Sequence, residues 1–239
     1  MSHKNALVMY AKKPSPGKVK TRLTQGLNPL TSQEASDFYQ VILTDLIRLL
    51  SATNSYDFFI CPQGDADEFR MAFRWPYRTI RDDGDGDLGH SLYRSFQQLH
   101  EMGYRYILII GSDVPFLNPE KINNAFTCLA NKSSFILGPD QQGGCYLIGG
   151  DKPYFIFHDI FWSQGKDFQI LLNRSKDLGL TTKVLSKEMD IDTTEDFKKL
   201  GQVLLATETR FQKSLPSLTD FFQMFHVKHP LYFDPQAND

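Results

Sequence analysis

The sequence predicts an α/β protein, a three-layer αβα sandwich around a mostly parallel central sheet. Two features carry this prediction. Short apolar runs with the composition of buried strands alternate with longer segments in which apolar residues recur every three or four positions. Such alternation gives parallel strands joined by right-handed crossovers. In addition, 239 residues, 41% of them hydrophobic, are enough for one large domain or two small ones with a sizeable core.

The elements follow in order along the chain. Strands are expected at 6–11, 56–61, 77–80, 104–110, 134–139 and 145–150. Helices are expected at 31–51, 65–73, 87–103, 118–132, 167–180 and 193–205. The short segment 181–186 lies between the last two helices. The helix at 118–132 has a clear start, because Asn118 can cap it and Pro119 stands at its first position.

The alternation stops at about residue 205. The following residues are rich in Phe, His and Pro. We therefore expect a domain at 1–205 and a C-terminal helical or irregular appendage at 206–239. Its aromatic residues either pack it onto the domain or form a contact surface, and its end is expected to fray.

Composition excludes several classes of protein. The formal net charge of −2 suggests neither a nucleic-acid surface nor a membrane surface. Three cysteines without a CxxC pair make a disulfide framework or zinc ribbon improbable and favour a reducing, cytoplasmic location. The six-residue apolar run near the N-terminus is too short for a signal peptide or a membrane span.

A basic loop follows the first predicted strand. Its sequence AKKPSPGKVKTR carries five bases, Lys12, Lys13, Lys18, Lys20 and Arg22, and no acid. Such a loop is suited to binding phosphate, although a solvated charged loop is the alternative. It is not a Walker A loop, because Val19 stands where Ser or Thr is required.

A second loop, DDGDGDLG at 82–89, contains the glycine spacing of a dinucleotide-binding loop. We reject that interpretation, because Asp85 and Asp87 would repel a pyrophosphate and the loop follows the third strand. An EF-hand also fails, because Leu88 stands where Gly is needed and Arg94 where Glu is needed. Asp87 is more simply a helix cap, and the glycines can let the backbone approach a nucleobase.

Acidic residues follow three later segments. Asp113 comes just past the apolar strand at 104–110, where open α/β sheets bind their ligands, although it could merely cap the turn before Pro115. Asp140 lies in the glycine-rich segment 137–150, which could equally be a plain hairpin. Asp190 and Asp192 precede a helix, where capping is the ordinary role. Together with the basic loop, these acids indicate a divalent metal that binds the phosphates of a nucleoside di- or triphosphate.

Several motifs together carry a family resemblance over roughly residues 5–200. They are MYAKKPSPGKVKTRL, GDLGHSL, GSDVPFL, GPDQQGGCYLIGG, FWSQ and DIDTTEDF. In this order they resemble the bacterial DUF2064 family, also described as radical-SAM/selenodomain-associated transferase 1. That family resembles the nucleotide-diphospho-sugar transferases of glycosyltransferase-A fold. It is more distantly similar to the 2-phospho-lactate and molybdenum-cofactor guanylyltransferases.

The resemblance implies a fold, a ligand and a cofactor. One strand of the sheet, 145–150, should be antiparallel. Lys12, Lys18, Lys20 and Arg22 should meet phosphates, and Asp113 should bind the metal. The sequence departs from the family at two points: Gln142 replaces the usual acid of Asp-Gly-Gly-Tyr-Tyr, and Gln164 follows Trp162-Ser163 where the family commonly has Thr or Gly-Thr.

From this we expect a metal-dependent transferase that uses a nucleotide-activated donor, most simply a nucleotide sugar, with a small-molecule acceptor. A nucleotidyltransferase releasing pyrophosphate, or a nucleotide-binding protein with little turnover, is the alternative, and a homodimer is left open. Asp113, Lys20 and Arg22 are the expected catalytic residues, and Asp113, Asp140 and Asp192 the expected ligands of Mg²⁺ or Mn²⁺. The expected nucleotide contacts are Ala11, Lys12, Lys18, Lys20, Arg22, Gly86, Asp87, Gly89, Ser112, Gly143 and Gly144.

Overall fold

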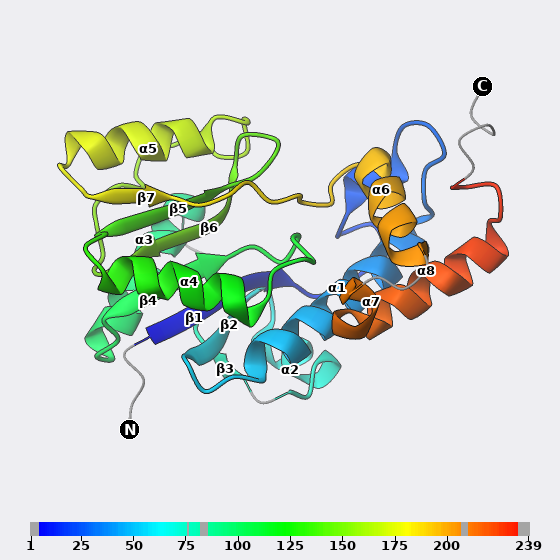
Figure 1. Cartoon of the computed structure of the whole chain (residues 1–239), viewed down its shortest axis with the longest axis horizontal. Helices are drawn as coiled ribbons and strands as arrows, with labels where there is room; N and C mark the ends of the chain where they lie inside the picture. Colours follow the sequence, from blue (N-terminus) through cyan, green and yellow to red (C-terminus); the bar gives the residue numbers. More distant parts are fainter. Residues whose placement is uncertain (1–4, 76, 82–85, 207–209, 234–239) are drawn as a thin grey trace.

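The computed structural model describes residues 5–75, 77–81, 86–206 and 210–233. Within these residues it has a seven-stranded sheet of order β3-β2-β1-β4-β6-β5-β7 (Figure 1). The strands are β1 (Asn5–Lys12), β2 (Asp57–Gln63), β3 (Arg78–Thr79), β4 (Tyr106–Ile110), β5 (Phe135–Pro139), β6 (Cys145–Gly150) and β7 (Thr182–Val184). The predicted mixed α/β fold with a mostly parallel sheet is confirmed.

In the described residues, the α helices lie between successive strands, except for the last three, which follow β7. They are α1 (Ser32–Ser51), α2 (Ala66–Ala72), α3 (Leu88–Glu101), α4 (Pro119–Ala130), α5 (Asp167–Asp177), α6 (Thr194–Leu205), α7 (Arg210–Ser214) and α8 (Pro216–Lys228). Capping agrees with the sequence: Asn118 accepts a hydrogen bond from the backbone N–H of Lys121, and Thr31 forms a capping box with Glu34. A short 3₁₀ helix, η1 (Thr21–Thr24), lies within the basic loop and was not predicted.

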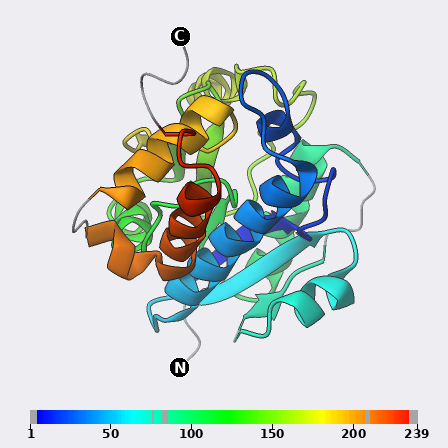
Figure 2. The ribbon, with the colours of Figure 1, turned by 90° about the vertical axis from the view of Figure 1, so that its right-hand side faces the viewer.

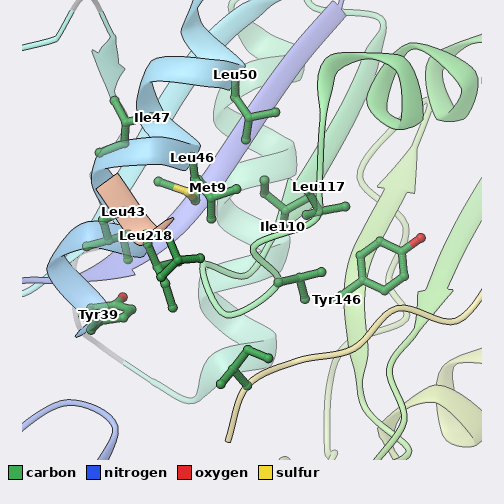
Figure 3. Close-up of a cluster of buried hydrophobic side chains, with 14 of the residues drawn as sticks. Met9, Tyr39, Leu43, Leu46, Ile47, Leu50, Ile110, Leu117, Tyr146 and Leu218 are labelled. Atoms are coloured by element: carbon green, nitrogen blue, oxygen red, sulfur yellow. The ribbon is translucent and has the colours of Figure 1, made fainter. Parts of the chain in front are cut away.

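The two faces of the sheet have separate cores because side chains alternate along each strand. On one face Met9 of β1 and Ile110 of β4 pack against Leu43 and Leu46 of α1 and Leu218 of α8 (Figure 3). On the other face Ala6 and Val8 of β1 belong to a cluster with residues of α3 and α5. The sheet is therefore covered on both sides, as a parallel sheet must be.

Strand β6 is the antiparallel strand that the family resemblance implies. It pairs antiparallel with both β4 and β5. Because β5 and β4 consequently run in the same direction, the loop 140–144 between β5 and β6 lies at the same edge of the sheet as the residues that follow β4. This arrangement brings two glycine- and acid-containing loops to one end of the strands.

The C-terminal segment packs its aromatic residues on α1 and α6. Phe222 and Phe225 of α8 contact the ring of Phe197 of α6 at centroid distances of 4.8 and 5.2 Å. Figures 1 and 2 both show α8 lying along α1. Asp45 of α1 is fully buried and accepts hydrogen bonds from the first backbone N–H groups of α8, at Ser217 and Leu218. The boundary at residue 205 stays a prediction.

In the part of the chain that the structure describes, no helix has both the length and the apolar composition needed to cross a membrane.

Candidate functional site

A cleft of about 630 Å³ opens at the carboxyl ends of β1 and β4. This is the edge at which sheets of this type bind ligands. Most of the residues predicted to contact a nucleotide or a metal line it: Ala11, Lys12, Lys18, Lys20, Arg22, Ser112, Asp113, Asp140, Gly144 and Asp192. The topology thus gathers residues that lie as far apart in the sequence as Ala11 and Asp192.

Lys20 is the most enclosed of these bases. Its side chain is only 4% exposed, and its Nζ lies 2.6 Å from Oδ1 of Asp113 and 3.4 Å from Oδ1 of Asp192. The same Nζ donates to the carbonyl oxygen of Ile191 at 2.6 Å. Its backbone is left-handed, with φ of 49°, an unfavourable conformation that these contacts hold in place. Lys20 therefore joins the basic loop to the two acidic segments.

Arg22 is placed differently. Its side chain is 59% exposed, and NH1 lies 3.0 Å from Oδ2 of Asp192. NH1 also donates a long hydrogen bond of 3.4 Å to Oε1 of Gln142. Lys12 and Lys18 are exposed and line the same cleft. The cleft thus offers three accessible cations around one buried cation, which suits a ligand with several negative oxygens.

Asp113 stands past the end of β4 with its side chain 45% exposed. The preceding residue is fixed: the Oγ of Ser112 and the hydroxyl of Tyr39 are hydrogen-bonded at 2.8 Å, and that hydroxyl accepts from the backbone N–H of Lys12 at 3.1 Å. Burial, together with the nearby charge of Asp113, raises the pKa of Tyr39, so its hydroxyl keeps its proton. The ends of β1 and β4 are therefore linked through α1.

Asp190 was not among the predicted metal ligands, which were Asp113, Asp140 and Asp192. It lines the cleft, and its Oδ1 is buried without a hydrogen-bond partner. Burial and the negative charges of Asp140 and Asp192 raise its pKa to about 6. From the sequence alone, helix capping was the more probable role for this acid, two positions before Asp192.

The cleft suits a hard divalent cation by its chemistry. Five carboxylates line it, those of Asp113, Asp140, Asp167, Asp190 and Asp192, and oxygen donors of this kind are the ligands of Mg²⁺ and Mn²⁺. Within the described ranges, no three His, Cys, Asp or Glu side chains converge as a ready-made metal site. Lys20 supplies part of the positive charge instead.

The loop 140–144 is held by its own acid. Oδ1 of Asp140 accepts hydrogen bonds from the backbone N–H groups of Gln142 and Gly144, at 2.9 and 2.7 Å. Gly144 lines the cleft, whereas Gly143 does not: a Cβ at Gly143 would lie 2.1 Å from the carbonyl oxygen of Gly165. The structure thus places Gly143 where two loops meet, behind the cleft wall.

The loop before α3 contributes less than expected. Asp87 caps α3 by accepting from the backbone N–H of His90 at 2.9 Å. Gly89 packs against the backbone of Phe157, where a Cβ would meet the carbonyl oxygen at 2.1 Å. Leu88 lines the cleft, but Gly86, Asp87 and Gly89 are not among its lining residues. Gly84 and Asp85 lie outside the described residues.

Another wall of the cleft was missed altogether. It comprises Cys145, Ser163, Gly165 and Asp167. Asp167 begins α5, and an acid in the first turn of a helix ordinarily indicates only a favourable helix dipole. Its position beside the loop 140–144 depends on contacts that no local pattern shows.

Comparison with known proteins places this geometry in a family. The model of a family described as "Uncharacterized protein conserved in bacteria (DUF2064)" matches residues 46–164. No curated protein matches the chain. Among solved structures, one from Desulfovibrio desulfuricans G20 named "putative nucleotide-diphospho-sugar transferase" is 26% identical with a TM-score of 0.80, and the match covers 94% of this chain and 99% of that chain.

More distant structures share the fold alone. A cytidylyltransferase from Leptospira borgpetersenii serovar Hardjo-bovis is 11% identical with a TM-score of 0.57, over 98% of this chain and 98% of that one. An inositol-1-phosphate CTP transferase from T. maritima is 11% identical with a TM-score of 0.50, over 92% of this chain and 98% of that one.

Proposed function

This chain belongs to the DUF2064 family, and from that premise we propose that it is a metal-dependent transferase that uses a nucleotide-diphospho-sugar as donor. One observation carries the proposal. Lys20 and Arg22 lie opposite Asp113 and Asp192 in a single cleft at the carboxyl edge of the sheet. Cations for phosphate oxygens and carboxylates for a divalent ion are thereby combined, as nucleoside diphosphate chemistry requires. The name of the Desulfovibrio structure supports the same donor class.

The exposed cations bind the diphosphate. Lys18 and Arg22 are exposed and can approach its oxygens from solvent, and Arg22 can offer two parallel N–H groups to one phosphate. Lys20 stays between Asp113 and Asp192 and prevents these carboxylates from repelling the ligand. As the bond to the transferred sugar breaks, the same cations stabilise the charge that develops on the departing diphosphate.

Asp113, Asp140 and Asp192 would supply carboxylate ligands to the metal, with Asp190 in the same cleft, although these side chains do not converge as a ready-made site in the described residues. When bound, Mg²⁺ or Mn²⁺ supplies Lewis-acid neutralisation of the diphosphate. Gln142 is the one position in this region where an amide replaces the family's acid, so one anionic ligand fewer is available. Its Oε1 instead accepts from Arg22 and helps to orient the guanidinium.

The test follows the products of a donor panel. UDP-, GDP-, dTDP- and CDP-hexoses and, separately, the nucleoside triphosphates are incubated with the protein and Mg²⁺ or Mn²⁺. We expect metal-dependent release of a nucleoside diphosphate from one hexose donor. Release of pyrophosphate from a triphosphate would instead establish a nucleotidyltransferase. If no nucleotide raises the melting temperature, the nucleotide proposal is wrong, because a ligand at about 100 times its dissociation constant stabilises a protein by about 2.7 kcal/mol.

A further inference from the structure

One buried carboxylate oxygen in the cleft lacks a partner. Asp167 lines the cleft and is only 8% exposed. Its Oδ2 accepts a hydrogen bond from the backbone N–H of Ser163 at 3.0 Å, whereas its Oδ1 is buried and has no hydrogen-bond partner among the described residues. Leaving such an oxygen unsatisfied is costly, so its position in a cleft wall indicates that a ligand donates a hydrogen bond to it.

The backbone around Asp167 is rigidly built. Gly143 and Gly165 meet so closely that a Cβ at Gly143 would lie 2.1 Å from the carbonyl oxygen of Gly165. The N–H of Phe168 donates to the carbonyl oxygen of Gly143 at 3.1 Å. The start of α5 is therefore fixed against the loop 140–144, and the Asp167 side chain is presented from a defined position. This is the arrangement of a binding contact rather than of a solvated surface acid.

The chemistry of this wall differs from that of the phosphate wall. Cys145, Ser163, Gly165 and Asp167 include no cation, and a carboxylate here would repel a diphosphate. The lysines and Arg22 come instead from the loop after β1. A donor diphosphate therefore lies against the basic loop, which leaves the Asp167 wall for the other reactant.

Cys145 is the neighbouring nucleophile that has to be considered. Burial, and then the charges of Asp140 and Asp167, raise the pKa of its thiol. Cys145 consequently stays protonated and is a poor nucleophile. A covalent intermediate on its sulfur is disfavoured, which leaves the attacking group to the acceptor itself.

We propose that Asp167 binds an alcohol acceptor, such as a polyol or a sugar, and takes its proton. Oδ1 accepts the hydrogen bond of the attacking hydroxyl. As the acceptor oxygen bonds to the sugar carbon, its proton passes to Oδ1. The bond from that carbon to the diphosphate breaks, and the electron pair leaves on the diphosphate oxygen. This inference rests on the proposed function, and it adds the chemical class of the acceptor, which the proposed function leaves open.

The experiment compares Asp167→Asn with the wild type, and Asp177→Asn is the matched control. Asp177 is an exposed acid at the other end of the same helix. An amide at 167 has the size of the acid and can still accept from Ser163, but its NH₂ then faces the ligand. Nucleoside diphosphate binding is measured by calorimetry with Mn²⁺, and turnover as nucleoside diphosphate released with glycerol, sorbitol or water as acceptor.

We expect Asp167→Asn to bind the nucleoside diphosphate as the wild type does and to release it from the donor roughly a hundredfold more slowly. Asp177→Asn should change neither quantity. Equal turnover in Asp167→Asn and wild type would overturn the role of Asp167 while leaving the proposed function intact. Absence of nucleotide binding in the wild type would instead overturn the proposed function, and with it this inference.

A second readout covers a wild type that binds nucleotide without measurable turnover. Saturation-transfer NMR then measures the binding of glycerol and sorbitol to the complex of protein and nucleoside diphosphate. In this experiment Mg²⁺ takes the place of Mn²⁺. Polyol binding that is present in wild type and Asp177→Asn but lost in Asp167→Asn supports the acceptor site. Polyol binding that is absent in the wild type, or unchanged in Asp167→Asn, overturns it. Asp167→Ser serves as the second variant if the amide lowers the melting temperature.

Discussion

Lys20 and Arg22 are two positions apart, yet the fold gives them different surroundings. Lys20 is almost fully enclosed between two acids, whereas Arg22 is mostly exposed. Removing Lys20 would leave Asp113 and Asp192 uncompensated, so its loss affects stability as well as binding. Removing Arg22 leaves nothing buried and unpaired. Substituting Lys20 is therefore expected to affect both stability and ligand binding, whereas substituting Arg22 is expected to affect ligand binding alone.

We predict that Arg22→Ala weakens nucleoside diphosphate binding by roughly ten- to a hundredfold, because a charge-assisted hydrogen bond contributes about 1.5–3 kcal/mol. The melting temperature without ligand should not change. Lys13→Ala is the control, since Lys13 belongs to the same loop but pairs with Glu68 at 2.7 Å and is not a lining residue of the cleft. Binding is measured by calorimetry. An equal loss of nucleoside diphosphate affinity in both variants would show that the loop acts only through its net charge.

Gln142 tests whether the missing family acid limits turnover. We predict that Gln142→Asp increases metal-dependent donor breakdown, because a carboxylate at this position can hold a divalent ion and an amide cannot. Gln142→Asn is the matched control of equal size without charge. Donor breakdown is followed by release of the nucleoside diphosphate. No difference between the two variants would mean that Asp140, already in the same loop, suffices for activity.

At the scale of elements, both ends of α8 are hydrogen-bonded to acidic side chains of α1. Asp45 caps the start of α8, and Glu34 receives Lys228 and His229 from its end at 2.8 and 2.9 Å. Burial opposes ionisation of Glu34, but hydrogen bonds from Lys228, Thr31 and His229 outweigh it and lower its pKa to about 2. The C-terminal segment is thus attached through a carboxylate that ionises more readily in the folded state.

The sign of the pH dependence follows from this shift. A carboxyl pKa lowered from 4.5 to about 2 stabilises the fold above pH 4.5, and the stabilisation is lost as the pH falls towards 2. We predict that Glu34→Gln loses about 1–3 kcal/mol at pH 6, allowing for screening at the exposed Lys228, and progressively less below pH 4.5. Urea unfolding at pH 6 and at a pH below 4.5 measures the free energy of unfolding of the variant and the wild type. Asp37→Asn is the control, because Asp37 is an exposed acid of α1. A deficit that does not vary with pH would contradict it.

At the scale of the whole molecule, local pattern predicted the layers of the fold but not the direction of every strand. Apolar runs such as Tyr106–Ile110 and the periodic helix at 31–51 determine the layers whatever their distant partners are. The short strands β3 and β7, of two and three residues, lie within the predicted strand 77–80 and the segment 181–186, and their pairing with β2 and β5 places them in the sheet. The antiparallel direction of β6 came from the family resemblance, since its composition does not distinguish direction.

The candidate site was less predictable because its walls are built by long-range contacts. The basic loop and Asp113 stood out by composition and by position after a strand. Asp167 and Asp190 did not, because each has an ordinary explanation at a helix start and only tertiary structure brings it into the cleft. Gly143 and Gly89 were predicted to contact the ligand; neither is a lining residue of the cleft, and each lies close to a backbone carbonyl.

The central claim is that Asp113 binds a metal which in turn binds the diphosphate. Calorimetric titration of a nucleoside diphosphate into wild type and Asp113→Asn, each with and without Mn²⁺, tests it most directly. We predict that Mn²⁺ tightens binding to the wild type at least about tenfold, or about 1.4 kcal/mol, and has little effect in Asp113→Asn. The variant should remain folded, because the Asn side chain keeps an oxygen that can accept from Lys20, and Lys20 also contacts Asp192 and the carbonyl oxygen of Ile191. An equal effect of Mn²⁺ on both proteins would contradict the account.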